Sequence, residues 1–147
     1  MASPEINQMR QIMKQVPMWK VAVKNLEDEA ETYRKMAECI DVGAVDMSRV
    51  SSGSLSCSSP TEAAAARREK LEEKAGECEI QQEVIALKIR KISRAIEALD
   101  DMEKKVIRGR YIEGQSWVFI GIGLYISEKW ARTKERTAVK KMAAMCL

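Results

Sequence analysis

The sequence predicts an all-α protein, in which a long, coiled-coil-like helical hairpin precedes a group of shorter helices. Two runs of apolar residues alternate at spacings of three and four, the heptad pattern of helices that pack together. The 147 residues include only 7 Gly and 3 Pro, and 32% are charged, so the turn residues of a many-stranded sandwich are scarce. We expect residues 1–99 to form the hairpin, an oligomerisation region, and residues 100–147 to form a second domain.

The first predicted helix begins at Ser3-Pro4-Glu5, where a hydroxyl cap precedes a proline and an acid in the first turn. Pro17 follows inside the apolar pattern and predicts either a kink or a break. Beyond it lies the first heptad stripe, which consists of Trp19, Val23, Leu26, Ala30, Tyr33, Ala37 and Ile40.

A polar connector is predicted over residues 43–60, where seven of the eighteen residues are Ser. It is longer than the usual helix–helix loop and has too little apolar surface to bury. A second helix is expected to start at Ser59-Pro60-Thr61-Glu62, which has a capping-box pattern. The second heptad stripe consists of Leu71, Ala75, Cys78, Gln82, Ile85, Ile89, Ile92, Ile96 and Leu99. The two stripes can pair within one chain or between subunits, and the pattern does not choose.

Composition excludes several classes of function. With 0 His, the chain lacks the imidazole of Ser-His-Asp and Cys-His enzymes and of His-ligated metal centres. The cysteines, Cys39, Cys57, Cys78 and Cys146, include no Cys-x-x-Cys pair, so we expect reduced thiols, no metal and no cofactor. Cys39 and Cys78 are expected to pack as small apolar residues. An apolar leader and a long apolar run are both absent, so we expect a cytoplasmic protein without membrane contact.

The C-terminal third predicts a short helix, a tight turn and a long helix. A helix over residues 102–112 is expected to follow the start signal at Asp100, with Gly114 beyond it at positive φ. Ser116 then caps the short helix WVFIGIG, the turn 124–126 follows, and Ser127 caps a helix from 128 to about 145. This order is typical of helix-turn-helix domains, whose second helix enters the major groove of DNA.

Positive charge is concentrated on the long C-terminal helix. Residues 116–147 carry six basic and two acidic side chains, a net charge of +4, whereas residues 1–99 carry 15 basic and 16 acidic ones, a net charge of −1. A basic face on one helix is the feature that phosphate binding requires.

A set of apolar, aromatic and basic residues is distributed over residues 99–142. Its members are Leu99, Arg110-Tyr111, Gly114, Ser116-Trp117, Ile120, Leu124, Ile126-Ser127, Ala131 and Ala138-Val139-Lys140-Lys141-Met142. This set resembles the fourth conserved region of sigma-70-type factors. With the hairpin and the Ser-rich connector, the chain resembles RinA-type and ArpU-type transcriptional regulators of phages and prophages. The resemblance implies sequence-specific binding of double-stranded DNA, contact with RNA polymerase, a bacterial host cytoplasm and no enzymatic activity.

Several residues depart from that family pattern. Tyr125 occupies a turn position that is often Gly, Gly121 replaces the usual Ala, and Glu135 stands where an apolar residue is usual. An additional apolar patch consists of Val118, Phe119, Ile122 and Tyr125. We expect this patch either to pack against the N-terminal hairpin or to form an interface with another subunit or with RNA polymerase.

The long C-terminal helix is expected to have an apolar face and a DNA-binding face. The apolar face consists of Ala131, Ala138, Val139 and Met142. The candidate DNA-binding residues are Ser127, Glu128, Lys129, Arg132, Thr133, Arg136, Lys140 and Lys141. Arg132 and Arg136 are candidate base contacts, because the Arg fork reads guanine, and Thr133 can touch a thymine methyl group. The three lysines are candidate phosphate contacts, and Trp130 is expected to pack against the protein.

Two other functions fit the same elements. A small terminase-type subunit for DNA packaging also joins a helix-turn-helix to helical oligomerisation segments, and ring-shaped oligomers would favour it. A non-DNA helical adaptor would use both stripes and the last helix to bind proteins, and the absence of salt-sensitive DNA binding would favour it. The heptad helices can also support a homo-oligomer.

Overall fold

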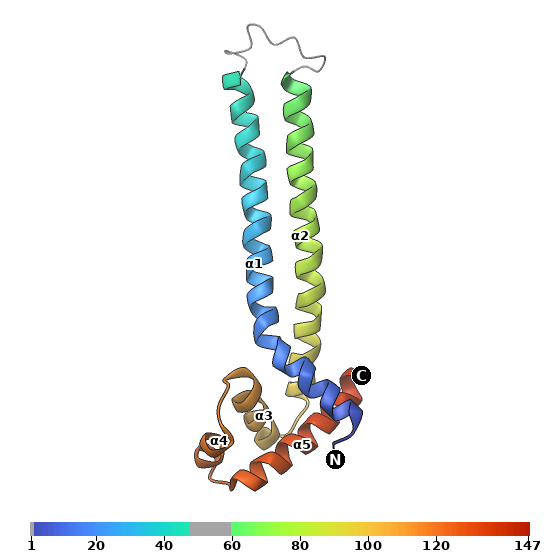
Figure 1. The fold of residues 1–147 in the computed structure, drawn as a ribbon, viewed down its shortest axis with the longest axis vertical. Helices are drawn as coiled ribbons and strands as arrows, with labels where there is room; N and C mark the ends of the chain where they lie inside the picture. Colours follow the sequence, from blue (N-terminus) through green and yellow to red (C-terminus); the bar gives the residue numbers. More distant parts are fainter. Residues whose placement is uncertain (1, 48–59) are drawn as a thin grey trace. The chain divides into compact units, whose positions relative to one another are not determined.

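The fold is helical throughout the residues that the structure describes, which are 2–47 and 60–147 of a computed structural model (Figure 1). Its elements are α1 (Pro4–Met47), α2 (Pro60–Glu97), α3 (Asp101–Ile107), the π-helical turn η1 (Arg108–Ile112), α4 (Trp117–Leu124) and α5 (Glu128–Cys146). The predicted all-α class is therefore confirmed. None of the described helices is long and apolar enough to cross a membrane.

Helix α1 begins where the capping signal predicts, because the Ser3 hydroxyl accepts a hydrogen bond from the Ile6 backbone N–H at 3.3 Å. It continues through Pro17 without a break and reaches Met47. The helix therefore includes the first residues of the predicted connector. The remainder of the predicted connector, with Cys57 and Ser59, lies outside the described residues.

The chain forms two compact units, one comprising Met1–Val21 with Ala86–Leu147 and the other Ala22–Ile85. In the second unit, α1 and α2 run side by side in opposite directions (Figure 1). Buried Ala30, Ala75 and Cys78 form its core, and Leu26 and Tyr33 pack against them. The heptad stripes thus contact each other within one chain in this structure. Cys78 is buried as expected, but Cys39 is exposed, so its predicted packing is wrong.

The first unit joins the start of α1 to the C-terminal helices in one core. The buried residues of this core are Ile6, Met9, Met13, Val16, Ile92, Ala95, Ile96, Leu99, Ile107, Ala138, Val139, Met142 and Ala143. The compact units therefore do not divide at residue 99, because the apolar residues that precede Pro17 pack against α5. The start of α1, up to Val21, belongs structurally with the C-terminal helices.

A smaller core lies beneath α4. Buried Val106, Ile120 and Ala131 meet there, and Trp117, Leu124 and Ile126 pack against them. The helix predicted over 102–112 instead changes from α3 to the π turn η1 at Arg108. Gly109 allows α4 to approach this turn, since a Cβ atom at Gly109 would lie 3.3 Å from Ile120 Cγ1 and 2.7 Å from Gln115 Oε1. The close approach of the two elements is a contact that the local sequence pattern did not predict.

Candidate nucleic-acid interface

The segment from α4 through the turn to α5 has the termini that the sequence predicts. The Ser116 hydroxyl accepts from the Phe119 N–H at 3.2 Å, and the Ser127 hydroxyl accepts from the Trp130 N–H at 3.0 Å. Tyr125 between them has φ +57°, so the turn does place a non-glycine residue in the left-handed region. Gly114 also has positive φ, at +68°, as predicted. The two caps and the left-handed residue fix where α4 ends and α5 begins.

Gly121 has a structural role in this turn. The Ile126 N–H donates to the Gly121 carbonyl at 2.9 Å, so the chain folds back directly over this residue. A Cβ atom at Gly121 would lie 2.8 Å from the Ile126 carbonyl oxygen. Alanine would therefore collide with the backbone of the turn.

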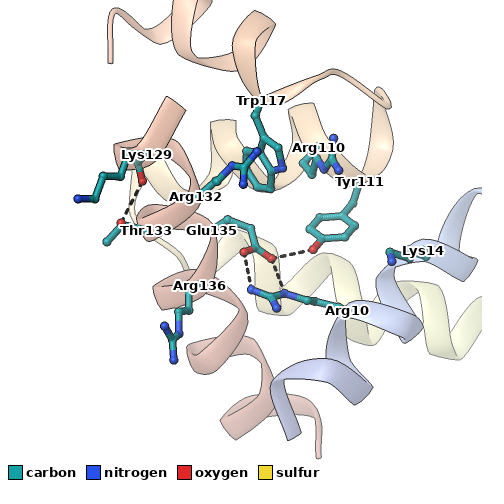
Figure 2. Close-up of a pocket in the computed structure, with 10 residues that line it drawn as sticks. All are labelled: Arg10, Lys14, Arg110, Tyr111, Trp117, Lys129, Arg132, Thr133, Glu135 and Arg136. Carbon is teal, nitrogen blue, oxygen red and sulfur yellow. Dashed lines mark hydrogen bonds and ion pairs between the residues drawn. The ribbon is translucent and has the colours of Figure 1, made fainter. Parts of the chain in front are cut away.

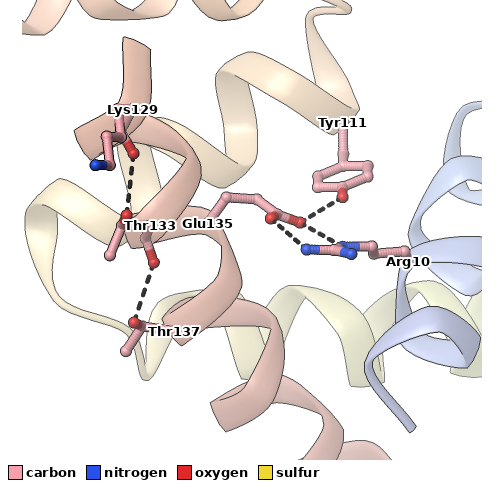
Figure 3. Close-up of polar contacts among 6 residues, drawn as sticks. All are labelled: Arg10, Tyr111, Lys129, Thr133, Glu135 and Thr137. Atoms are coloured by element: carbon pink, nitrogen blue, oxygen red, sulfur yellow. Dashed lines mark hydrogen bonds and ion pairs between the residues drawn. The ribbon is translucent and has the colours of Figure 1, made fainter. Parts of the chain in front are cut away.

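Helix α5, which we call the reader helix, has the two faces that its sequence predicts. Ala131, Ala138, Val139 and Met142 are fully buried. The opposite face exposes Ser127, Glu128, Lys129, Arg132, Thr133, Arg136 and Lys140. The Thr133 hydroxyl donates to the Lys129 carbonyl at 3.0 Å, and the Thr137 hydroxyl donates to the Thr133 carbonyl at 3.1 Å (Figure 3). These hydroxyls bond to their own helix, so Thr133 can present its methyl group outward.

Glu135 on the reader helix is buried in spite of its charge, and two residues from other elements hold it (Figure 3). Arg10 of α1 donates from Nε and Nη2 to the two carboxylate oxygens at 3.0 and 2.9 Å, and the Tyr111 hydroxyl donates to Oε1 at 2.7 Å. Burial and the bond to Glu135 raise the pKa of Tyr111 well above its usual value. The same carboxylate raises the pKa of Arg10. The buried acid is therefore compensated by a cation from the start of α1.

A cleft of about 450 Å³, which we call the basic cleft, lies beside this ion pair (Figure 2). Its lining residues are Arg10, Lys14, Arg110, Tyr111, Trp117, Lys129, Arg132, Thr133, Glu135 and Arg136. Six of these ten side chains are basic, and the only acid, Glu135, is paired with Arg10. The cleft therefore concentrates positive charge on one side of the reader helix, which favours an anionic ligand.

Trp117 organises two arginines at the edge of the basic cleft (Figure 2). The guanidinium of Arg110 lies 4.7 Å from the centre of its ring, and that of Arg132 lies 5.8 Å from it. Arg132 is also bonded to Glu128 one turn earlier on the reader helix, at 2.7 Å. Stacking on Trp117 holds both planar forks in place, and the ion pair with Glu128 adds to this for Arg132. This reduces the side-chain entropy that binding would otherwise remove.

Lys141 and Trp130 of the reader helix both interact with other side chains of the protein. The Lys141 ammonium bonds at 2.7 Å to the carboxylate of Glu103, which is 1% exposed, and it lies 3.7 Å from Asp100. Because it neutralises a buried acid inside the protein, we leave Lys141 out of the proposed phosphate contacts. Trp130 is 50% exposed with the Lys134 ammonium over its ring, so its predicted packing is wrong.

The side chains of the apolar patch are exposed in the first unit. Val118, Phe119 and Ile122 are more than half exposed, and Tyr125 is 96% exposed. Both arrangements predicted for this patch stay predictions. The patch remains an exposed apolar surface on α4 and its turn.

Six residues of the basic cleft were not among the predicted DNA-binding residues: Arg10, Lys14, Arg110, Tyr111, Trp117 and Glu135. Arg10 and Lys14 are one helical turn apart, beside the apolar residues of α1. Their spacing indicates that they share one face of the helix, but it does not indicate which element that face contacts. Among the described residues, no cluster of three or more Cys, Asp or Glu side chains could hold a metal ion. No protein-family model, curated protein or solved structure matches the chain.

Proposed function

We propose that this protein is a sequence-specific DNA-binding transcriptional regulator of phage type, with α5 as its reader helix. The observation that carries the proposal is the exposed basic face of α5, which borders a cleft with six basic side chains. The preceding short helix and capped turn support it, because this order of elements presents the second helix to the major groove. The proposed function implies a bacterial cytoplasm.

The roles of individual side chains follow from their positions on the reader helix. Arg132 and Arg136 are exposed near its middle and are the proposed base contacts, through bidentate bonds to guanine. Thr133 lies between them and offers its methyl group to thymine. Lys129 and Lys140 are exposed toward the two ends of the helix and suit the phosphates that border the groove. Ser127 and Glu128 lie at its N-terminus, where Glu128 also orients Arg132.

The exposed apolar patch fits a protein partner better than DNA. It carries no charge, and its residues lie on α4 rather than on the basic face of the reader helix. RNA polymerase or another subunit of the regulator is the proposed partner. An exposed patch of this kind on a monomer marks an interaction site more often than not.

Fluorescence anisotropy with labelled DNA fragments from the gene's own neighbourhood tests the proposed function. We expect one fragment to bind much more tightly than the pool, with an affinity that falls steeply with salt. The variant with Arg132→Ala and Arg136→Ala should lose that preference, because each lost base contact costs about 1–3 kcal/mol. A matched control with Lys24→Ala and Lys70→Ala removes two charges from exposed positions in the other unit and should keep it.

Two outcomes would contradict the proposal. Binding that is uniform over all fragments and unaffected by the two arginines would indicate a non-specific clamp, and ring-shaped oligomers would then favour a packaging subunit. Absence of salt-dependent binding would favour a helical adaptor that binds only proteins.

A further inference from the structure

We propose that the basic cleft holds a phosphate group of the DNA backbone, with Lys14 of α1 and Arg110 of η1 as its ligands. This inference rests on the proposed DNA-binding function and extends it beyond the reader helix. It assigns a role in DNA binding to the start of α1, whose pattern otherwise suggests only a packing helix.

The start of α1 is fixed to the reader helix firmly enough to position a ligand. Met9 and Met13 are almost completely buried in the core that also contains Val139 and Met142 of α5. Arg10 adds its two hydrogen bonds to Glu135 on the same helix. Lys14 lies one turn after Arg10, and residues four apart share a helix face, so Lys14 is held at the rim of the basic cleft.

The charges of Lys14 and Arg110 are available to an outside anion. Glu135 is the only acid that lines the basic cleft, and Arg10 pairs with it. In the described part of the chain, the exposed Lys14 makes no ion pair. Arg110 donates one bond to the Gln115 carbonyl at 3.2 Å and stacks on Trp117, which leaves other N–H donors of its fork for a ligand.

The position of the two residues indicates phosphate rather than base. Lys129, Arg132 and Arg136 line the same cleft from the reader helix. When the reader helix enters the major groove, the DNA strand at the edge of that groove would therefore pass Lys14 and Arg110. Neither residue lies on the helix proposed to enter the groove. Backbone contacts from flanking elements set the register of a DNA-binding domain, and Lys is suited to them as a compact point charge.

Salt-dependent binding of Lys14→Ala to the preferred fragment and to unrelated DNA tests this inference. The slope of log affinity against log salt concentration should become shallower by about 0.9, the value for one phosphate contact. Affinity should fall by about fivefold near 0.15 M salt, equally for both DNAs, because a phosphate contact carries no sequence information. Lys14→Arg keeps the charge and should keep the slope. Arg110→Gln should reduce the slope again, provided that its thermal unfolding matches that of the wild type.

Lys20→Ala is the matched control, because it removes the same charge from an exposed position of α1 outside the basic cleft. If the wild type binds its fragment but Lys14→Ala behaves like Lys20→Ala, this inference is wrong and the proposed function stands. If the wild type shows no salt-dependent DNA binding, the proposed function fails and this inference with it. Inorganic phosphate at millimolar concentration and constant ionic strength should not displace the DNA. Displacement that Lys14→Ala abolishes would reveal a site for free phosphate instead.

Discussion

Arg10 and Glu135 are 125 residues apart in the sequence and form a two-bond ion pair between α1 and the reader helix. The Glu135 side chain is 4% exposed and that of Arg10 is 28% exposed, so Arg10 supplies the counter-charge of a buried acid. The pair therefore links the stability of the reader helix to the first turns of α1.

Arg10→Met should lower the free energy of unfolding by about 2 kcal/mol, measured by urea denaturation. The substitution leaves the buried Glu135 carboxylate with only the Tyr111 hydroxyl, and the effect is smaller than for a fully buried pair because Arg10 is partly exposed. Adding Glu135→Leu should restore most of the loss, since the position then becomes apolar. A double variant no more stable than Arg10→Met would contradict this account.

Tyr111→Phe should lower stability near neutral pH by about 1.5 kcal/mol, because it removes a hydrogen bond to a charged group. The pKa of Tyr111 is raised in the folded state, mainly by burial and then by Glu135. The stability from the protonated hydroxyl is therefore fully present below the unfolded pKa of about 10 and is lost as the pH rises toward the folded pKa. Urea denaturation from pH 7 to 11 should show the wild-type advantage shrinking above pH 10. A constant difference would refute the assignment.

Lys141→Met should lower the thermal midpoint of unfolding by several degrees, whereas Lys140→Met should leave it nearly unchanged. The two lysines are neighbours on the reader helix, but only Lys141 neutralises the buried Glu103. Glu103→Gln should partly rescue Lys141→Met, because it removes the buried charge. Equal midpoints for the two lysine variants would show that Glu103 does not need its partner. In DNA-binding assays the order should reverse, with Lys140→Met the weaker binder.

Gly121→Ala should destabilise the protein by about 2 kcal/mol, although helix propensity alone predicts a gain of about 1 kcal/mol. The sign follows from the 2.8 Å approach that a Cβ atom would make to the Ile126 carbonyl oxygen. Gly123 lies in the same helix with no atom within 4 Å of an added Cβ, so Gly123→Ala should be neutral or stabilising in the same calorimetric measurement. Similar effects for both variants would mean that the turn can shift to accept a side chain.

Local signals predicted the ends of the C-terminal helices well, and distant contacts explain what they could not predict. Ser116 and Ser127 cap helices within three residues of themselves, so the bounds of α4 and α5 can be read from the sequence. The sequence did not indicate that Arg10 is the partner of Glu135, because the two residues are 125 positions apart and meet only through the packing of α1 against α5.

The same limit applies to the basic cleft and to the compact units. The charges of the reader helix were evident, but the contribution of Lys14 depends on how α1 packs against α5. The heptad stripes predicted which positions of α1 and α2 are buried, yet the pattern before Pro17 did not indicate that its apolar residues belong to a different core. Periodicity identifies a buried face but not the element that covers it.

Tyr125→Gly should raise the free energy of unfolding by about 1 kcal/mol, measured by urea denaturation, because φ +57° is strained for any residue with a Cβ atom. The 96% exposed ring offers no internal packing to offset that strain. Gly114→Ala is the mirror control, since it places a Cβ at φ +68° with open space around it and should destabilise by a similar amount. A less stable Tyr125→Gly would show that the ring packs in solution. A more stable variant that still binds DNA but no longer binds polymerase would indicate that the strained tyrosine serves the apolar patch.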